Sequence, residues 1–177
     1  AAANACFRAM GYTTNEFDKH MRDFTGAARR LEIIHEDVGR NFVAFRDFAH
    51  APSKLRATQA SVVNQFPNRK VTAVFELHTY SSLSKSFIPQ YSEAMNEVDH
   101  AIVYFDPSVV QHKRLEELSP EFVKDSFARD NLEVFTKTND LKRRLSKVPS
   151  ENHVLLMMSS GRFGGVIFNP APHPATS

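Results

Sequence analysis

The chain has 177 residues, of which 42% are hydrophobic and 24% are charged, and its formal net charge is +2 at pH 7. This profile is typical of one soluble globular domain, or of one domain with an attached fragment, and it excludes a large basic field for nucleic acid. Cys6 is the only cysteine, which excludes a disulfide within the chain, and no apolar run approaches the roughly 18 residues that span a bilayer.

The first 28 residues predict a helical hairpin. Residues 1–10 are rich in alanine, and Gly11 is placed to end the helix that they form. The segment 13–16 is typical of a capping box that starts a second helix, and Gly26 interrupts that helix. The N-terminus has no basic segment and no long apolar core, so it does not indicate a signal peptide. Because the chain begins in helix-like sequence without an initiating methionine, we expect it to be part of a longer protein.

From residue 31 onward the chain predicts an α/β domain. Two strand-like runs, 31–35 and 41–46, are joined by a short turn and indicate an antiparallel hairpin. The rest alternates apolar strands with helices, which is typical of a mostly parallel sheet buried on both faces. We expect about six strands, five parallel and one antiparallel at an edge, flanked by helices. The further strands are predicted at 71–77, 101–105, 132–135 and 154–158, and the helices at 52–66, 85–98, 119–128 and 139–148.

A first polar cluster, residues 47–53, lies between a predicted strand and a predicted helix. Ligands of open α/β sheets bind at the carboxyl ends of the strands. Pro52 suits the first position of the helix, whose N-terminus points backbone N–H groups toward the same place. Asp47 can accept hydrogen bonds from a ribose diol, and it can equally form an Asx turn or cap the helix. Both interpretations of Asp47 stay open at this point.

Two further clusters follow the next strands. In the segment 76–85, His78 and Lys85 can bind a carboxylate or a phosphate, and the hydroxyl groups between them can orient a substrate. A stretch rich in serine and threonine is equally typical of a loop that leads into a helix. The next cluster, residues 105–107 with 112–114, favours an exposed basic loop.

The last cluster is the segment S-S-G-R-F-G-G at 159–165. Its glycines permit close approach of the backbone to a ligand and expose N–H donors. It matches neither G-x-G-x-x-G nor a phosphate-binding Walker loop. The remaining histidines lack the spacing of metal ligands, and no G-x-S-x-G elbow occurs, so neither a metal site nor a catalytic nucleophile is predicted.

Four segments occur together in an informative order: F-T-G-A-A-R-R-L-E at 24–32, D-F-A-H-A-P at 47–52, F-E-L-H-T-Y-S at 75–81, and S-S-G-R-F-G-G at 159–165. In this order they resemble the Mur ligase family, the ATP-dependent ligases that form amide bonds in peptidoglycan synthesis. The resemblance covers roughly residues 1–165. It implies that residues 1–28 are the helical tail of a central ATPase domain, that 29–165 form the Rossmann-like C-terminal ligase domain, and that 166–177 form an extended tail.

The resemblance also implies a mechanism. ATP phosphorylates a carboxylate of a UDP-N-acetylmuramate substrate, an amine attacks the acyl phosphate, and Mg²⁺ stabilises the transferring phosphoryl group. By position, Arg30 matches the arginine that reaches the ATP phosphates, Asp47 matches the aspartate that holds the ATP ribose, and Phe48 lies near the base. The residues implied to face the amine substrate are His50, His78, Thr79, Ser82, Lys85, Ser159 and Arg162.

The sequence departs from the family at the amine substrate. Members that add L-alanine typically carry H-R-Y-S-R after the second parallel strand, and here the segment 78–82 reads H-T-Y-S-S. Two arginines that would grip a carboxylate are therefore replaced, and Ala51 stands where a second histidine is common. Glu76 and the segment 159–165 resemble instead the recycling ligase that attaches L-alanyl-γ-D-glutamyl-meso-diaminopimelate to UDP-N-acetylmuramate. We expect this tripeptide as substrate, with free L-alanine as the alternative.

The resemblance further implies what the sequence does not supply. A phosphate-binding loop, Mg²⁺ ligands and a UDP-binding domain are not in this sequence, so the chain alone is expected to lack ligase activity and to bind ATP weakly. The implied partners are the N-terminal and central domains of the same protein, without nucleic acid or membrane, in the bacterial cytoplasm. A second alternative is a non-catalytic Rossmann-like binding module. A response-regulator-like domain is excluded because the first strand does not end in an acidic pair.

Overall fold

The computed structural model describes residues 8–14 and 30–168, and the chain divides into two compact units, Ala1–Arg30 and Leu31–Ser177. In the first unit Gly11 has a φ of +89° and donates its backbone N–H to the carbonyl of Arg8, so it ends a helical turn as predicted. The remainder of the predicted hairpin, Cys6 included, lies outside the described residues. Within the described part of the chain, no helix is both long and apolar enough to cross a membrane.

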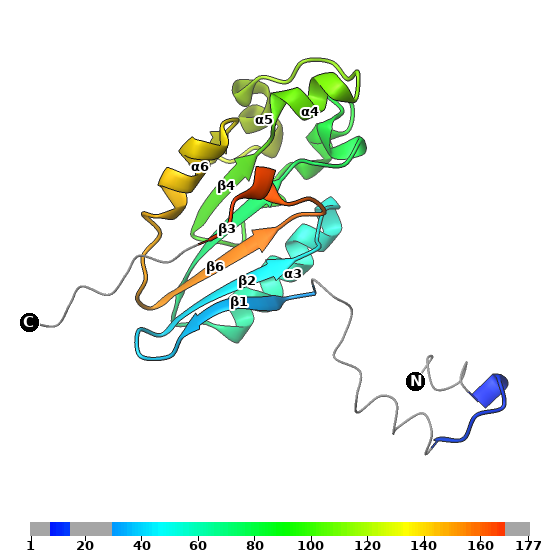
Figure 1. The fold of residues 1–177 in the computed structure, drawn as a ribbon, viewed down its shortest axis with the longest axis vertical. Coiled ribbons are helices and arrows are strands. Elements are labelled where there is room, and N and C mark those ends of the chain that lie inside the picture. Colours follow the sequence, from blue (N-terminus) through cyan, green and yellow to red (C-terminus); the bar gives the residue numbers. More distant parts are fainter. Residues whose placement is uncertain (1–7, 15–29, 169–177) are drawn as a thin grey trace, which may run out of the picture. The chain divides into compact units, whose positions relative to one another are not determined.

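The second unit is built on one six-stranded sheet with the order β1-β2-β6-β3-β4-β5 (Figure 1). Only β1 runs antiparallel, against β2 at one edge, and the other neighbouring strands pair in parallel. The predicted α/β architecture of five parallel strands and one antiparallel edge strand is therefore confirmed. The strands are β1 (Glu32–Asp37), β2 (Phe42–Asp47), β3 (Lys70–Glu76), β4 (His100–Tyr104), β5 (Glu133–Phe135) and β6 (His153–Met158).

The register of the central strands brings three chain segments to one edge of the sheet. Strand β6 is buried along its whole length and lies between β2 and β3. Asp47 at the end of β2 is opposite Met158 of β6, and Met158 is in turn opposite Phe75 of β3. The segments that follow β2, β3 and β6 therefore leave the sheet side by side.

Four α-helices and three short 3-10 helices connect and cover the strands of this unit as described. Proline occupies the first turn of α3, α4 and α5, where its missing N–H and fixed φ are tolerated. Ser119 caps α5 by accepting a hydrogen bond from the N–H of Phe122. The helices are α3 (Pro52–Gln65), η1 (Ser81–Leu83), η2 (Ile88–Tyr91), α4 (Pro107–His112), α5 (Pro120–Phe127), α6 (Thr138–Leu145) and η3 (Phe163–Gly165).

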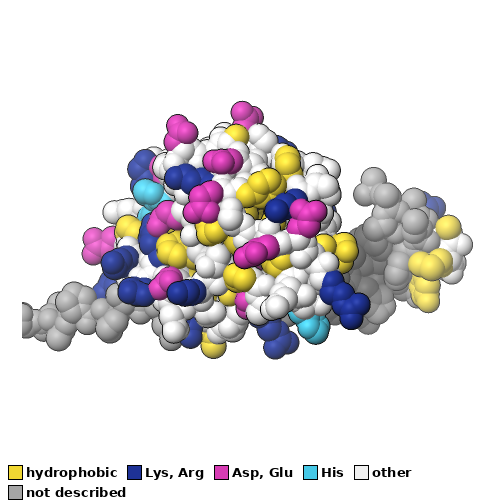
Figure 2. All heavy atoms as spheres, turned by 90° about the horizontal axis from the view of Figure 1, so that it is seen from above, with side chains coloured by type: hydrophobic (Ala, Val, Ile, Leu, Met, Phe, Trp, Pro, Cys, Tyr) yellow, Lys and Arg dark blue, Asp and Glu magenta, His cyan; other side chains and the backbone are white. Residues whose placement is uncertain are grey.

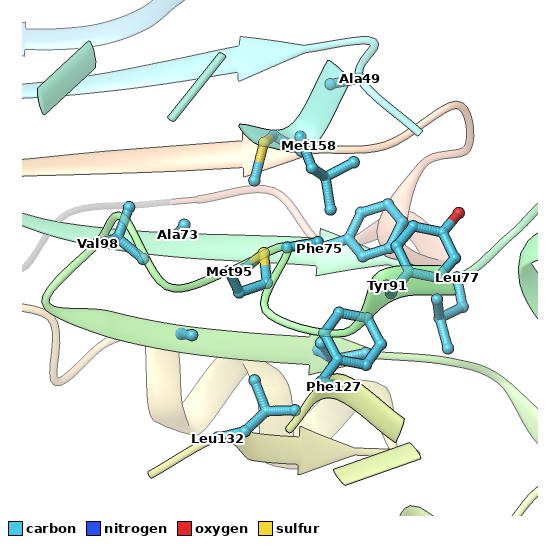
Figure 3. Packing of buried hydrophobic residues seen from close by; sticks show 14 of the residues in the cluster. Ala49, Ala73, Phe75, Leu77, Tyr91, Met95, Val98, Phe127, Leu132 and Met158 are labelled. Atoms are coloured by element: carbon cyan, nitrogen blue, oxygen red, sulfur yellow. The ribbon is translucent and has the colours of Figure 1, made fainter. Parts of the chain in front are cut away.

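The sheet separates two apolar cores. The larger core is packed by side chains of α3, η2, α4 and α5 on one face, and its centre around Phe75, Tyr91 and Phe127 is drawn in Figure 3. The smaller core lies under α6 and η3 on the other face. Phe168 stacks on Phe42 at 5.8 Å between ring centroids, so the start of the segment predicted as an extended tail packs against this second core.

The predicted helix at 85–98 is wrong. The segment forms only η2 and a series of turns, although Tyr91, Ala94, Met95 and Val98 are buried at helical spacing. Its carbonyl groups are bound by side chains from elsewhere. Arg129 donates to the carbonyls of Met95, Val98 and Asp99, and Gln59 donates to that of Ala94 at 2.8 Å. These external donors satisfy backbone groups that a helix would satisfy internally.

One helix was not predicted. Helix α4 occupies residues for which the sequence favours an exposed basic loop, and it ends at His112. Asp106 caps it by accepting hydrogen bonds from the N–H and the hydroxyl of Ser108 at 2.8 and 2.7 Å. The capping pattern D-P-S is a helix start signal, and a helix of six residues is too short for hydrophobic periodicity to reveal.

Candidate functional site

Three loops meet at the carboxyl edge of the central strands. They follow β2 (residues 48–51), β3 (residues 77–80) and β6 (residues 159–162), and the sheet register places them next to one another (Figure 1). Of the residues predicted to bind ligands, Asp47 ends β2, and the three loops carry Phe48, His50, His78, Thr79, Ser159 and Arg162. Ser82 lies in η1 and Lys85 beyond it, whereas Arg30 belongs to the other unit.

Asp47 binds backbone and side-chain donors of its own domain. Its Oδ1 accepts hydrogen bonds from the N–H of Ala49 at 2.7 Å and from the hydroxyl of Thr58 at 3.3 Å. Its Oδ2 accepts one from the N–H of Leu31 at 2.9 Å. The Ala49 contact is the Asx turn that the sequence left open, whereas α3 has no side-chain cap. Only 6% of Asp47 is exposed, so any ligand would meet an already ordered carboxylate.

His50 is held in place from both sides. Its Nδ1 lies 2.9 Å from the carbonyl of Phe48, and the two rings are in edge contact at 5.2 Å. Its own carbonyl accepts a hydrogen bond of 2.5 Å from the hydroxyl of Tyr91. Tyr91 is fully buried against Phe75 and stacks on Phe127, and burial raises the pKa of its hydroxyl, which therefore stays a donor (Figure 3).

Replacing Tyr91 with phenylalanine is expected to loosen this loop. The variant keeps the stacked ring but leaves the carbonyl of His50 without its donor, which costs about 1–2 kcal/mol. The free energy of unfolding in denaturant measures this loss. Tyr80→Phe is the matched control because Tyr80 is 62% exposed, and it should leave stability unchanged. Equal stabilities of the Tyr91→Phe and Tyr80→Phe variants would contradict the anchoring role.

The hydroxyl groups after β3 mainly bind each other. Thr79 Oγ1 donates to Ser82 Oγ at 2.9 Å and accepts a hydrogen bond from the N–H of Ser82 at 3.1 Å. This arrangement starts η1, as expected of a serine- and threonine-rich loop that leads into a helix. Lys85 lies farther along, with its Nζ 3.5 Å from Glu116 and 5.9 Å from the ring centroid of Phe122.

The most tightly connected residue at this edge is Glu76, the last residue of β3. Its Oε2 accepts hydrogen bonds from the hydroxyl of Ser159 and from the N–H of Phe163, the latter at 2.9 Å. Ser159 Oγ in turn accepts the N–H of Gly161 at 2.7 Å. Glu76 thereby fixes the loop after β6 against the loop after β3, and it is only 4% exposed.

The turn at Gly161 leaves no room for a side chain. A Cβ on this residue would lie 2.7 Å from Glu76 Oε2 and 2.7 Å from the ring of His78. The predicted role of glycine in permitting close approach thus applies to a contact inside the protein. Arg162, next in the chain, is exposed, as is Arg30 in the other unit.

Two residues of this edge were not among the predicted site residues. Glu76 was noted as the first residue of the segment 76–85 and for its resemblance to the recycling ligase, without a role of its own, and Tyr91 was placed in a predicted helix. A buried strand that ends in glutamate is a detectable signal, because an unpaired carboxylate is rarely buried. Among the described residues, no group of three potential metal-binding side chains occurs.

The fold and this edge define a class: an α/β domain with a mostly parallel sheet, in which the carboxyl ends of the strands are the candidate ligand-binding edge. Residues 29–161 match the family model described as Mur ligase, glutamate ligase domain. The chain therefore belongs to the Mur ligase family, and the matched residues form the C-terminal domain of that family's ligases. The resemblance seen in the sequence is confirmed.

Similar proteins agree with this assignment. The UDP-N-acetylmuramate–L-alanine ligase of Thermotoga neapolitana is 30% identical over 162 residues, which is 90% of this chain and 35% of that protein. The crystal structure of the UDP-N-acetylmuramate-alanine ligase of Thermotoga maritima has a TM-score of 0.66 at 22% identity, over 93% of this chain and 34% of that one. The crystal structure of a murein peptide ligase of Psychrobacter arcticus has a TM-score of 0.62 at 19% identity, over 80% of this chain and 29% of that one. These two structures establish the fold.

The chain thus spans about a third of the length of the relatives that it matches.

Proposed function

We propose that this chain is the C-terminal domain of an ATP-dependent ligase that joins an amine to UDP-N-acetylmuramate, with free L-alanine as the amine. One observation supports the proposal above others. Within a domain of the Mur ligase family, Asp47, His50, His78 and Ser159 lie on adjacent loops at one sheet edge. The relative from Thermotoga neapolitana, which carries the L-alanine ligase name, aligns with 90% of the chain.

The proposed reaction has two steps. A carboxylate oxygen of UDP-N-acetylmuramate attacks the γ-phosphorus of ATP, which forms an acyl phosphate and releases ADP. The amine nitrogen then attacks the acyl carbon, the bond to the phosphate oxygen breaks, and the nitrogen loses a proton as the amide forms. Mg²⁺ would neutralise phosphate charge during the first step, and we assign its ligands to other parts of the full protein.

The residues of this domain would position the two substrates. We assign Asp47 and Phe48 to the ATP ribose and base and Arg30 to the phosphates. His50, His78, Ser159, Arg162 and Lys85 are assigned to the amine substrate, and Thr79 and Ser82 to the shape of its loop. The carboxylate of Asp47 is pre-ordered by three protein donors, so little ordering remains when a ligand binds.

A second candidate amine is the tripeptide L-alanyl-γ-D-glutamyl-meso-diaminopimelate. The specific observation is the absence of arginine from residues 78–82, where L-alanine ligases typically hold the small carboxylate. The two basic residues assigned to the amine substrate lie outside that segment: Arg162 is exposed on the loop after β6, and Lys85 is paired with Glu116. A longer substrate with several carboxylates would suit such dispersed cations.

The proposal is tested with a complete ligase that carries this chain, supplied with ATP, Mg²⁺ and UDP-N-acetylmuramate. L-alanine and the tripeptide are offered separately, and both ADP release and the amide product are measured. Higher kcat/KM for L-alanine supports the main proposal, and higher kcat/KM for the tripeptide supports the second candidate. No amide from either amine contradicts both. The enzyme would act in the bacterial cytoplasm, where we expect its partners to be its own remaining domains and these substrates.

A further inference from the structure

Glu76 has one carboxylate oxygen that the protein leaves without a hydrogen bond. Oε2 accepts from Ser159 and Phe163, whereas Oε1 has no hydrogen-bond partner within residues 8–14 and 30–168. The ring of His78 is the closest basic side chain recorded beside it, with its Nδ1 3.8 Å from Oε1, which is beyond hydrogen-bond distance. No lysine or arginine of the described chain pairs with this carboxylate.

This oxygen has open hydrogen-bonding capacity on a largely buried side chain, and it is not among the fully buried side-chain atoms without a partner in the described residues. The side chain of Glu76 is 5% exposed, and a buried carboxylate is stable only when donors or a positive charge satisfy it. Oε1 lies on the side of His78, and the side chain of His78 is 41% exposed, so this side of the carboxylate can be approached from solvent. A donor that arrives with a positive charge would complete the site.

The position of Oε1 indicates which donor this is. Glu76 ends β3 at the edge where the loops after β2, β3 and β6 meet, beside Ser159 and His78. Both candidate amines enter as ammonium groups, and an ammonium forms short, charge-assisted hydrogen bonds with a carboxylate. We propose that Glu76 Oε1 accepts a hydrogen bond from the ammonium group of the amine substrate, and that His78 lies beside this acceptor. This inference rests on the proposed function and names a residue that selects the substrate class.

The arrangement separates two roles of one side chain. Oε2 holds the loop after β6, and a glutamine in place of Glu76 can hold it equally, because an amide oxygen accepts the same two hydrogen bonds. The amide nitrogen would then occupy the position of Oε1 and would present a donor to an incoming donor. Glu76→Gln therefore removes the proposed acceptor of the ammonium group and retains the two hydrogen bonds that hold the loop after β6.

The experiment measures steady-state kinetics of the complete ligase, with the amine that the wild type uses, and compares Glu76→Gln with Glu151→Gln. Glu151 is exposed and lies just before β6, at the opposite edge of the sheet, so this variant is the matched control. Glu76→Gln is expected to raise the KM of the amine at least roughly tenfold and to leave the KM of ATP within about twofold. Glu151→Gln should change neither.

A second measurement distinguishes charge recognition from a displaced loop. The hydroxy-acid analogue, in which a hydroxyl replaces the amino group, is titrated as a competitive inhibitor. In the wild type the analogue should bind much more weakly than the amine, and in Glu76→Gln this difference should shrink. An unchanged amine KM in Glu76→Gln, or an equal loss of amine and analogue affinity, overturns the inference. If the wild type forms no amide with either amine, the proposed function itself fails.

Discussion

Replacing Gly161 with alanine is expected to lower kcat/KM of the complete ligase by at least about a hundredfold, since misplacing a site by about 1 Å is enough for such a loss. The new methyl group would lie 2.7 Å from Glu76 Oε2 and from the ring of His78, closer than carbon atoms approach such groups. Gly161 does not adopt a left-handed backbone, so the clash and not the backbone conformation produces the effect. The loops after β3 and β6 must then separate.

The matched control for this variant is Gly39→Ala. A Cβ at Gly39, in the turn between β1 and β2, meets only Asp37 Oδ1 at 3.5 Å, an ordinary contact. Its activity should equal that of the wild type. The free energy of unfolding of the Gly161 variant should also fall by about 1–3 kcal/mol, the usual cost of overpacking, so that it unfolds at a lower denaturant concentration. Wild-type kinetics in Gly161→Ala would show that the contact between the two loops has no part in catalysis.

Acid is expected to destabilise the domain through His153. This residue begins β6, is 2% exposed, and has its Nε2 2.8 Å from the hydroxyl of Thr72. Burial lowers the pKa of His153 from 6.5 to about 4, with His100 adding to the effect and Asp99 opposing it. In the unfolded chain the same imidazole takes up its proton near pH 6.5.

The two pKa values of His153, folded and unfolded, determine whether acid raises or lowers the stability of the domain. Between pH 6.5 and about 4 the unfolded chain binds a proton that the folded chain does not, so stability falls as pH falls. The loss should reach about 3 kcal/mol by pH 4, at 1.36 kcal/mol for each pKa unit.

The measurement is the free energy of unfolding of the wild type and of His153→Gln between pH 7 and 4. The variant is less stable at pH 7 because of its imperfect fit, but the difference between the two proteins should shrink as pH falls. His112→Gln, at the exposed end of α4, is the control and should follow the wild type at all pH values. If the free energies of unfolding of the wild type and His153→Gln change with pH in parallel, this role of His153 is refuted.

The parts of the fold that were predictable depend on patterns within one segment. The strand 154–158 is an unbroken apolar run, and its burial on both faces follows from that pattern. The segment 85–98 carries apolar residues at helical spacing, and the helix predicted from that spacing was wrong. Its conformation depends on Arg129 and Gln59, which are 30 or more residues away from the carbonyls that they bind. No local pattern contains that information.

The candidate site shows the same division. Asp47, His78 and Ser159 were predicted because each follows a recognisable strand or belongs to a family motif. That Glu76 joins the loops after β3 and β6 required the sheet order, since 83 residues separate it from Ser159. Tyr91 was predicted as part of a helix, and its anchoring of His50 depends on the turn that replaces that helix.

The central place of β6 has a consequence for biosynthesis. Strands β2 and β3 pair with β6 and not with each other, although β6 comes after the other five strands of this sheet in the described sequence and is therefore synthesised after them. Until residues 153–158 have emerged, a nascent chain holds two apolar strands with open edges, which are prone to pair with other chains. Because Ser159 and Phe163 follow β6, Glu76 receives its hydrogen bonds only after that strand has inserted. Any premature termination before this point would leave both the sheet and the candidate site unformed.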